Sequence, residues 1–503
     1  MSGLFILSVI VGYFAILLTI SYLTSRGAKN DTFFTGNRSS KWYLVSFGMI
    51  GASLSGVTFI SLPGLVGKSG FTYMQIVIGY MIGYAIISFV LIPLYYKLNL
   101  TSIYSYLGRR YGETTHKIGA SFFILSRVLG ASVRLFLVAD ILDFFVLRQY
   151  GVSFEFSVLL TLILIYIYTY RGGIKTIVWT DTLQTLFMLV ALVVSVILIS
   201  NAIGTETSTE GLKSLGMTDW FFTSDPKANN YWLKGILGGL FITLGMTGLD
   251  QDMMQKNLSC KNEKESRKNM IWFSVVLFVV NFVFLILGGL LFLYAQEHTE
   301  ILSALEKMPV NKQSDRLFPL IALNGGLGVF VGITFLLGLV AAAYSSADSA
   351  LTSLTTSTSV DLFKLDKWKD TQKAEKVRKW IHVGMTAVLF IVILLANEFK
   401  EKDVINTLFT LAGYTYGPLL GLFFFGILSK RKVADHLTWV VCLVVPVLIY
   451  IFKTYESYWF DGYQSGHEIL GVNGVLCFIG LLVLSKSSKK DNIQGLSGNK
   501  LQN

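Results

Sequence analysis

Charged side chains are scarce in this sequence. Asp, Glu, Lys and Arg together make up 15% of its 503 residues, apolar residues make up 53%, and the mean hydropathy is +0.59. Ordinary soluble domains contain about 25% charged residues. The composition therefore excludes a soluble globular core, a set of soluble domains and a disordered chain, and it indicates a polytopic membrane protein.

Cysteines and histidines are also few. The three cysteines, Cys260, Cys442 and Cys477, lie far apart and form neither a CxxC metal pattern nor a disulfide framework. The five histidines fall in loops or at the ends of apolar runs. This distribution argues against a histidine proton relay inside the membrane.

Long apolar runs fill most of the chain. Because a helical span needs about 20 mostly apolar residues, the sequence predicts an all-α polytopic membrane protein with about 13 transmembrane helices. The runs are 3–24, 42–66, 71–96, 118–147, 153–170, 174–200, 232–255, 270–295, 327–358, 379–396, 404–429, 435–452 and 468–485. The first run lacks a basic leader and a cleavage site, so we expect a retained span. The transmembrane domain would cover 1–486, followed by a disordered cytoplasmic tail, 487–503.

Basic residues mark one side of the expected bundle. With the N-terminus outside, most of the 42 Lys and Arg residues, Lys256 among them, fall in loops on the inward side. The positive-inside rule then predicts an outside N-terminus and a cytoplasmic C-terminus in the plasma (inner) membrane. The net charge of +11 follows from this topology, and no nucleic-acid partner is expected.

Two runs combine glycine with hydroxyl residues in the middle of the span. These are residues 47–58 of the second run and 235–248 of the seventh, and each run opens a set of five spans, about 42–200 and 232–429. Matched glycine-interrupted spans in two halves are typical of inverted-repeat transporters, where unwound backbone lines a binding site. The alternative is that small residues only allow close helix packing. Two matched positions favour the binding site.

Hydroxyl residues and a carboxylate interrupt the ninth run. Ser345 and Ser349 are one helical turn apart and share a face, with Ser346 beside them. Sodium binds oxygen ligands of this kind, and the carbonyls of an unwound helix supply more. The alternative is that the hydroxyls bond back to their own backbone. Asp348 in the same run favours a functional site, because a buried carboxylate is costly in a membrane.

Three further ionisable residues fall inside apolar runs. Asp181 would lie about 10 Å into the sixth span, as a helix N-cap or as a cation or proton site. Arg127 and Arg134 are two turns apart on one face of the fourth span. Either they pair with Asp181 or Asp348 across the bundle, or one of them binds an anionic group of a substrate.

With these residues in view, the sequence resembles the sodium/solute symporter family, which includes sodium-coupled galactose, proline and sialic acid transporters. The resemblance covers nearly the whole chain. The matching stretches are FFTGNR (33–38), GG (172–173) with WTD (179–181), AAYSS (342–346) and GYTYGPLLG (413–421). It implies the LeuT-type fold of two inverted five-helix repeats, here spans two to six and seven to eleven.

The resemblance also implies sodium sites. The first would use the carbonyls of Gly51, Leu54 and Ala342 with the hydroxyls of Ser345 and Ser346. Some members have a second site, and the residues that match it here are Asp181, Ser345, Asp348 and Ser349. Asp348 stands where the sialic acid members carry a serine, so the number of sodium ions per substrate is left open.

For the substrate, the chain most resembles the sialic acid branch. The expected substrate-binding residues are Ser53, Ser55, Thr58, Phe71, Gln75, Arg127, Arg134 and Thr243. That branch sets an arginine of the fourth span against a carboxylate, and either arginine would serve here. Thr243 falls where sugar-transporting members carry an asparagine, which weakens a galactose hypothesis. An anionic sugar acid is the first hypothesis, with a related sugar or an amino acid as alternatives.

The sequence therefore predicts a sodium-coupled symporter, not an enzyme, that imports a small polar solute by alternating access. We expect Na⁺ as the coupling ion and a lipid bilayer around a functional monomer. One alternative is an intramembrane aspartyl protease built on Asp181 and Asp348, although neither lies in the Tyr-Asp or Gly-x-Gly-Asp setting of such proteases. Another is a channel or a solute sensor on the same fold.

Overall fold

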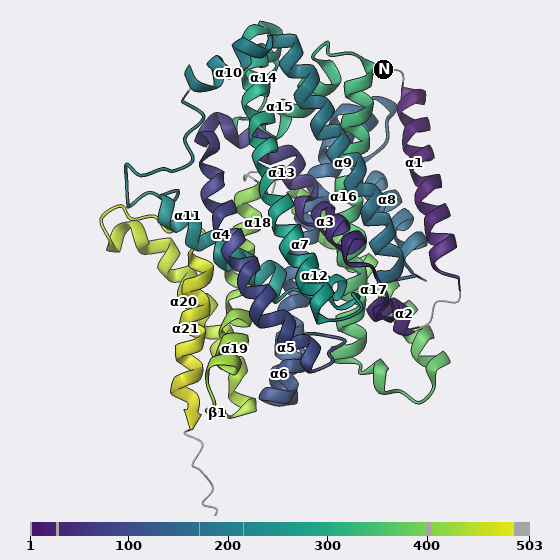
Figure 1. Ribbon diagram of the computed structural model, residues 1–503, viewed down its shortest axis with the longest axis vertical. Helices are drawn as coiled ribbons and strands as arrows, with labels where there is room; N and C mark the ends of the chain where they lie inside the picture. The colour runs from purple at the N-terminus through teal and green to yellow at the C-terminus, as the bar shows by residue number, and fades with distance from the viewer. Residues whose placement is uncertain (1–2, 27–29, 171, 215, 399–403, 487–503) are drawn as a thin grey trace, which may run out of the picture.

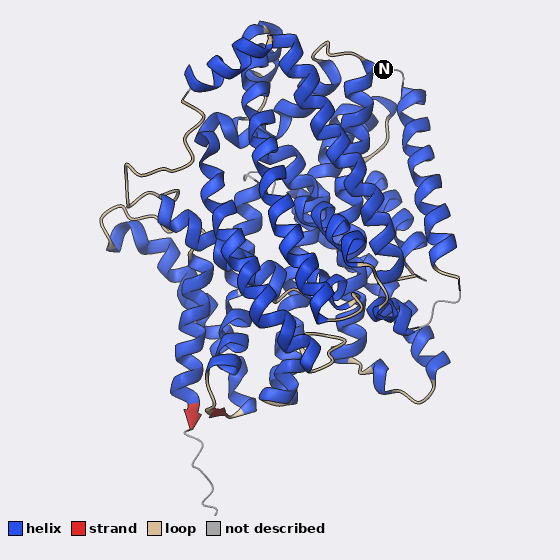
Figure 2. Cartoon of the chain, viewed as in Figure 1, coloured by secondary structure: helices blue, strands red, loops and turns tan. Residues whose placement is uncertain are grey.

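The computed structural model describes residues 3–26, 30–170, 172–214, 216–398 and 404–486. Almost all of this chain is helical (Figures 1 and 2). The strands found in these ranges are β1 (Lys432–Val433) and β2 (Ser485–Lys486), which pair antiparallel. The all-α expectation is confirmed, while the expected tail, 487–503, lies outside the described residues.

Each expected apolar run coincides with one helix or with consecutive helices. The residues of the first expected repeat form α3 (Trp42–Ser69), α4 (Tyr73–Ile86), α5 (Ile92–Lys97), α7 (Glu113–Leu142), α8 (Phe154–Thr169) and α9 (Ile174–Ile203). Those of the second form α11 (Trp232–Thr243), α12 (Gln251–Leu258), α13 (Glu263–Glu297), α16 (Val329–Ser357), α17 (Thr371–Glu398), α18 (Val404–Thr415) and α19 (Gly417–Leu428).

The remaining helices flank or connect these two sets. α1 (Gly3–Thr24) lies at one edge of the bundle, and α20 (Thr438–Trp459) and α21 (Ile469–Leu484) lie at the other (Figure 1). The short connecting helices are α2 (Asn30–Thr35), α6 (Ser105–Arg110), α10 (Thr205–Ser214), α14 (Thr299–Glu306) and α15 (Val310–Asn324). The two expected repeats therefore fill the middle of the molecule.

Helix length and composition agree with a membrane protein. Within the described ranges, 7 helical stretches are long and apolar enough to cross a membrane, or 9 if two bent pairs are each one span. One of the stretches, Trp42–Lys97, contains both the second and the third expected runs. Shorter apolar helices cover Ser8–Thr24, Phe154–Thr169 and Ile469–Leu484. The total of about 13 crossings and the inverted repeats stay predictions.

Both glycine-rich runs are broken, as the sequence predicts. Inside α3, Ser55 has φ 36° and ψ 169°, and a positive φ is rare for a residue other than glycine. α11 continues into a π-helical turn, Leu244–Gly248, and then meets α12 at 62°. A further bend, of 45°, separates α18 from α19. These two helices cover the expected run 404–429, and their bend is a feature that the sequence analysis did not predict.

Close packing accounts for glycines beside the break in α3. α3 lies against α9, α13 and α16. A Cβ atom on Gly48 would lie 3.0 Å from the Cβ of Asp181, and one on Gly51 would overlap the hydroxyl oxygen of Thr185. In the same way, a Cβ on Gly239 of α11 would overlap the carbonyl oxygen of Ile76. The packing and broken-helix interpretations therefore both hold, for different residues of the same runs.

Candidate substrate and sodium sites

The break in α3 lies at a cavity, and Ser55, the residue of the break, is part of its lining. We call it the central cavity. Its wall contains the expected substrate residues Ser53, Ser55, Thr58, Arg127, Arg134 and Thr243. Polar residues that sequence reasoning missed also line it, namely Tyr73, Tyr80, Tyr84, Thr247 and Asn281, and apolar residues such as Leu54 and Phe409 form the rest of the wall. The lining is rich in hydroxyl groups.

Phe71 and Gln75 lie outside the central cavity. The ring of Phe71 is buried and packs edge-on against Phe282, with the ring centroids 6.0 Å apart. The Gln75 side chain accepts a hydrogen bond from the Phe222 amide at 2.8 Å and donates one to the Asn230 carbonyl at 3.2 Å. Gln75 thus ties α4 to the connection before α11 and lines a second, outer cavity. We leave both residues out of the proposed substrate pocket.

The two arginines of α7 have different surroundings. The buried guanidinium of Arg127 contacts the carboxylate of Asp252 and lies 3.9 Å from an oxygen of Asp250. The expected partners, Asp181 and Asp348, are therefore wrong for Arg127. Arg134 has no ion pair or side-chain hydrogen bond within the described part of the chain, and its Nε is buried. Among the described residues that line the central cavity, Arg134 therefore carries a positive charge that no carboxylate neutralises.

α12 supplies charged residues that sequence reasoning did not place in a site. Asp250 precedes this helix and accepts hydrogen bonds from the Asp252 amide, at 2.9 Å, and from the Tyr416 hydroxyl. Lys256, which the sequence predicts in an inward loop, is 1% exposed and lies 4.0 Å from Asp252. The four-residue spacing of Asp252 and Lys256 was the available signal, because it puts both side chains on one helix face.

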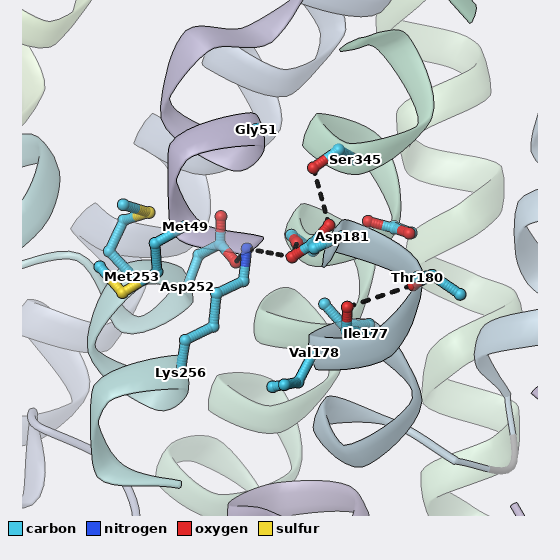
Figure 3. A network of polar contacts seen from close by, with 12 residues as sticks. Met49, Gly51, Ile177, Val178, Thr180, Asp181, Asp252, Met253, Lys256 and Ser345 are labelled. Atoms are coloured by element: carbon cyan, nitrogen blue, oxygen red, sulfur yellow. Dashed lines mark hydrogen bonds and ion pairs between the residues drawn. The ribbon is translucent and has the colours of Figure 1, made fainter. Parts of the chain in front are cut away.

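Asp181 lies where α9, α12 and α16 meet (Figure 3). One of its carboxylate oxygens accepts a hydrogen bond from the Ser345 hydroxyl at 2.7 Å, and the other accepts one from Ser349 at 3.4 Å. The ammonium of Lys256 lies 2.8 Å from that second oxygen. Because α9 begins at Ile174, Asp181 is not its N-cap. The structure thus brings together three of the residues expected at a second sodium site.

Asp348, the fourth of those residues, has another partner. One of its oxygens accepts a hydrogen bond from the Tyr168 hydroxyl of α8 at 2.8 Å. The other is buried and meets no hydrogen-bond donor in the ranges that the structure describes. Asp181 and Asp348 are therefore held by different side chains on different helices.

The residues expected at the first sodium site lie on α3 and α16, which contact each other. The Gly51 amide donates to the Thr185 hydroxyl at 3.0 Å, and Leu54 directly precedes the break at Ser55. Ala342 and Ser345 are fully buried. The Ser346 hydroxyl is also buried and finds no hydrogen-bond partner among residues 3–26, 30–170, 172–214, 216–398 and 404–486. A sodium ion or a water molecule would satisfy this hydroxyl.

The sequence profile of the Sodium:solute symporter family matches residues 33–436. The chain belongs to this family. This symporter is 27% identical over 468 residues to the sodium/sialic acid symporter NanT of Aliivibrio fischeri, covering 89% of this chain and 88% of the relative. It is 25% identical over 432 residues to the human sodium/iodide cotransporter, covering 82% of this chain and 65% of that protein.

Solved structures show the same fold. The symporter matches a substrate-bound, outward-open Na⁺-coupled sialic acid symporter with a TM-score of 0.80, at 21% identity and over 95% of this chain and 98% of the other. It matches the nucleobase-cation-symport-1 family transporter Mhp1 with a TM-score of 0.58, at 13% identity. The central cavity thus belongs to a helical transporter fold.

Family membership decides the class of function. The protein is an integral membrane transporter that couples the movement of sodium ions to that of a small solute. The family and these relatives are transporters, and they give no support to an aspartyl protease. The separate partners of Asp181 and Asp348 agree, because a protease dyad needs carboxyl groups that share a proton.

Proposed function

We propose that this symporter carries a small anionic solute of the sugar-acid class with sodium, and that Arg134 binds the carboxylate of the solute. The observation that carries the proposal is the contrast between the arginines of α7. Arg127 is neutralised by Asp252, whereas Arg134 has no carboxylate partner in the described chain. A lone cation at membrane depth is costly, and its planar guanidinium matches a carboxylate. Relatives named sodium/sialic acid symporters agree with an anionic sugar.

The other polar residues of the central cavity would bind the hydroxyl groups of such a solute. Ser53, Thr58 and Thr247 line it, and the Thr243 hydroxyl is buried without a partner in the part of the chain described. Hydroxyl side chains both donate and accept hydrogen bonds, as sugar hydroxyls do. Tyr84 adds an aromatic face to the wall. These groups would orient the solute while Arg134 holds its charge.

Sodium at the first site would join the interrupted α3 to α16. The carbonyls of Gly51, Leu54 and Ala342 with the hydroxyls of Ser345 and Ser346 are its proposed ligands. Because Leu54 and Ser55 line the central cavity, an ion that orders this backbone also orders the substrate pocket. Coupling of this kind is reciprocal, so solute tightens sodium binding by the factor by which sodium tightens solute binding.

The cellular setting follows from the same reasoning. We infer a plasma (inner) membrane location, an outside N-terminus and a cytoplasmic tail, supported by the loop charges. One chain supplies the central cavity and all the proposed sodium ligands, which supports function as a monomer.

Uptake into proteoliposomes tests the proposal. An imposed sodium gradient should accumulate a carboxylated sugar above its outside concentration, which separates a symporter from a channel or a sensor. Neutral sugars and amino acids are the comparison solutes. Arg134→Gln should abolish this uptake, while Arg26→Gln, at an exposed side chain whose hydrogen bond goes to the Tyr22 hydroxyl, should keep it. Equal uptake without sodium, or unchanged uptake by Arg134→Gln, would refute the proposal.

A further inference from the structure

The ammonium of Lys256 reaches a place where the family resemblance implies a sodium ion. Lys256 extends from α12 toward α9, and its Nζ lies 2.8 Å from a carboxylate oxygen of Asp181 (Figure 3). Lys256 is 1% exposed and Asp181 is fully buried. Both members of this ion pair are thus shielded from water.

The contacts around Asp181 already compensate its buried negative charge. The carboxylate accepts hydrogen bonds from Ser345 and Ser349 and has the Lys256 ammonium beside it. A buried carboxylate calls for one compensating positive charge, which lysine supplies. A sodium ion at the same carboxylate would stand beside the ammonium, and the two like charges would repel in a medium of low dielectric.

The other acidic side chains nearby do not lie as close to the Lys256 ammonium as Asp181 does. Asp252 lies 4.0 Å from the ammonium, but its carboxylate contacts Arg127. Asp348 accepts a hydrogen bond from Tyr168, and in the described chain no lysine or arginine nitrogen, that of Lys256 included, lies within 4.0 Å of its carboxylate. Lys256 is therefore matched with Asp181, and Arg127 is matched with Asp252.

We propose that Lys256 is a tethered cation that takes the place of a second sodium ion at Asp181, so that this symporter moves one sodium ion, bound at the first site, with each solute. The inference rests on the proposed function, because it counts charge against a monoanionic solute. One sodium ion and one monoanion carry no net charge. Transport is then electrically neutral, driven by the sodium gradient and indifferent to the membrane potential.

Sodium titration of the purified full-length protein tests the tethered cation. With choline chloride keeping the ionic strength constant, the free energy of stabilisation by NaCl is plotted, in units of RT, against ln[Na⁺]. At saturating sodium the slope of this plot equals the number of bound ions, so it should be about 1 in the wild type and in Lys256→Arg. Lys256→Gln frees Asp181 for sodium, and its slope should approach 2. The double variant Lys256→Gln/Asp181→Asn should return to 1. A wild-type slope near 2, or a slope of 1 in Lys256→Gln, would overturn the inference.

A second measurement needs no variant and remains decisive if Lys256→Gln does not fold. Wild-type proteoliposomes would be clamped with potassium and valinomycin at 0 and −100 mV under one fixed sodium gradient. The accumulation ratio of a monoanionic sugar acid should be the same at both potentials. A second sodium ion would raise that ratio by up to about 50-fold, since one charge across 100 mV corresponds to about 2.3 kcal/mol. Sodium-independent uptake would instead reject the proposed function, which is a different outcome.

Discussion

The hydroxyl of Tyr416 donates a hydrogen bond to the carboxylate of Asp250, which ties the bend between α18 and α19 to the bend between α11 and α12. Asp250 also caps α12 through the amides of Asp252 and Met253. Because Arg127 of α7 lies 3.9 Å from the same carboxylate, three separate parts of the chain meet at one acidic group. These contacts thus hold the two interrupted helices in a fixed position relative to each other, beside the central cavity.

Removing the hydroxyl of Tyr416 should destabilise the protein. Tyr416→Phe takes a hydrogen bond from a buried carboxylate, a loss worth about 1–3 kcal/mol. Reversible unfolding in mixed micelles would measure the change. Tyr344→Phe is the matched control, because its hydroxyl bonds to the uncharged Thr161 hydroxyl at 3.2 Å and should cost about 1 kcal/mol or less. Equal losses in the two variants would contradict the role of Asp250.

The Arg127–Asp252 pair should show strong coupling. Arg127→Met and Asp252→Leu each remove the nearest partner of a buried charge and leave it only a contact of about 4 Å, to Lys256 or to Asp250, so each should lower stability by up to about 3–5 kcal/mol. The double variant removes both charges and should lose much less than the sum. A double-mutant cycle on unfolding free energies measures this difference. Additive losses would show that the two charges do not stabilise each other.

Gly51 should not tolerate a side chain. In Gly51→Ala the added methyl group overlaps the Thr185 hydroxyl and displaces α3 from α9, at a cost of about 1–3 kcal/mol. Gly384→Ala is the control, since a Cβ there meets no atom of the described chain within 4 Å. That substitution should be neutral or stabilising, because alanine favours a helix over glycine by about 1 kcal/mol. Melting curves of both variants would decide, and similar shifts would argue against the close contact.

Ser346 should matter for sodium and little for folding. Its hydroxyl makes no hydrogen bond to any residue described in the structure, so Ser346→Ala should leave sodium-free stability unchanged. Loss of one ligand should raise the sodium concentration for half-maximal stabilisation about 10-fold, which corresponds to about 1.4 kcal/mol. Ser353→Ala, whose hydroxyl bonds to the Ala350 carbonyl at 3.0 Å, should keep the wild-type midpoint. An unchanged midpoint in Ser346→Ala would remove this residue from the sodium site.

The apolar runs and the break in α3 could be predicted from the sequence because their signals are local. A run of about 20 apolar residues specifies a helical span whatever it packs against. Glycines and hydroxyl residues in one mid-span stretch mark a weak helix, and the break falls at Ser55 in that stretch. The bend at Tyr416 also has a local signal in the sequence. Pro418 is the second residue of α19, and proline is common in the first turn of a helix, where its missing amide hydrogen costs nothing.

The ion pairs could not be predicted, because their partners are far apart in the sequence. Arg127 and Asp252 are separated by 125 positions, and no local rule joins them. In the sequence, Asp252 and Lys256 look like the charged end of a span leading into a basic loop. Only the 62° bend before α12 turns that segment back into the bundle, toward Asp181 and Arg127. Only the tertiary structure therefore shows which of the two arginines lacks a carboxylate partner.

Two aromatic rings border both the central and the outer cavity. Tyr73 and Phe409 line each of them, and the hydroxyl of Tyr73 is held by that of Tyr80 at 3.1 Å. The ring of Phe409 packs against the His467 ring instead. Side chains change rotamer in picoseconds to nanoseconds, whereas helix bundles rearrange in microseconds to milliseconds. A change of rotamer at Phe409 would therefore alter the boundary that the two cavities share without any movement of a helix.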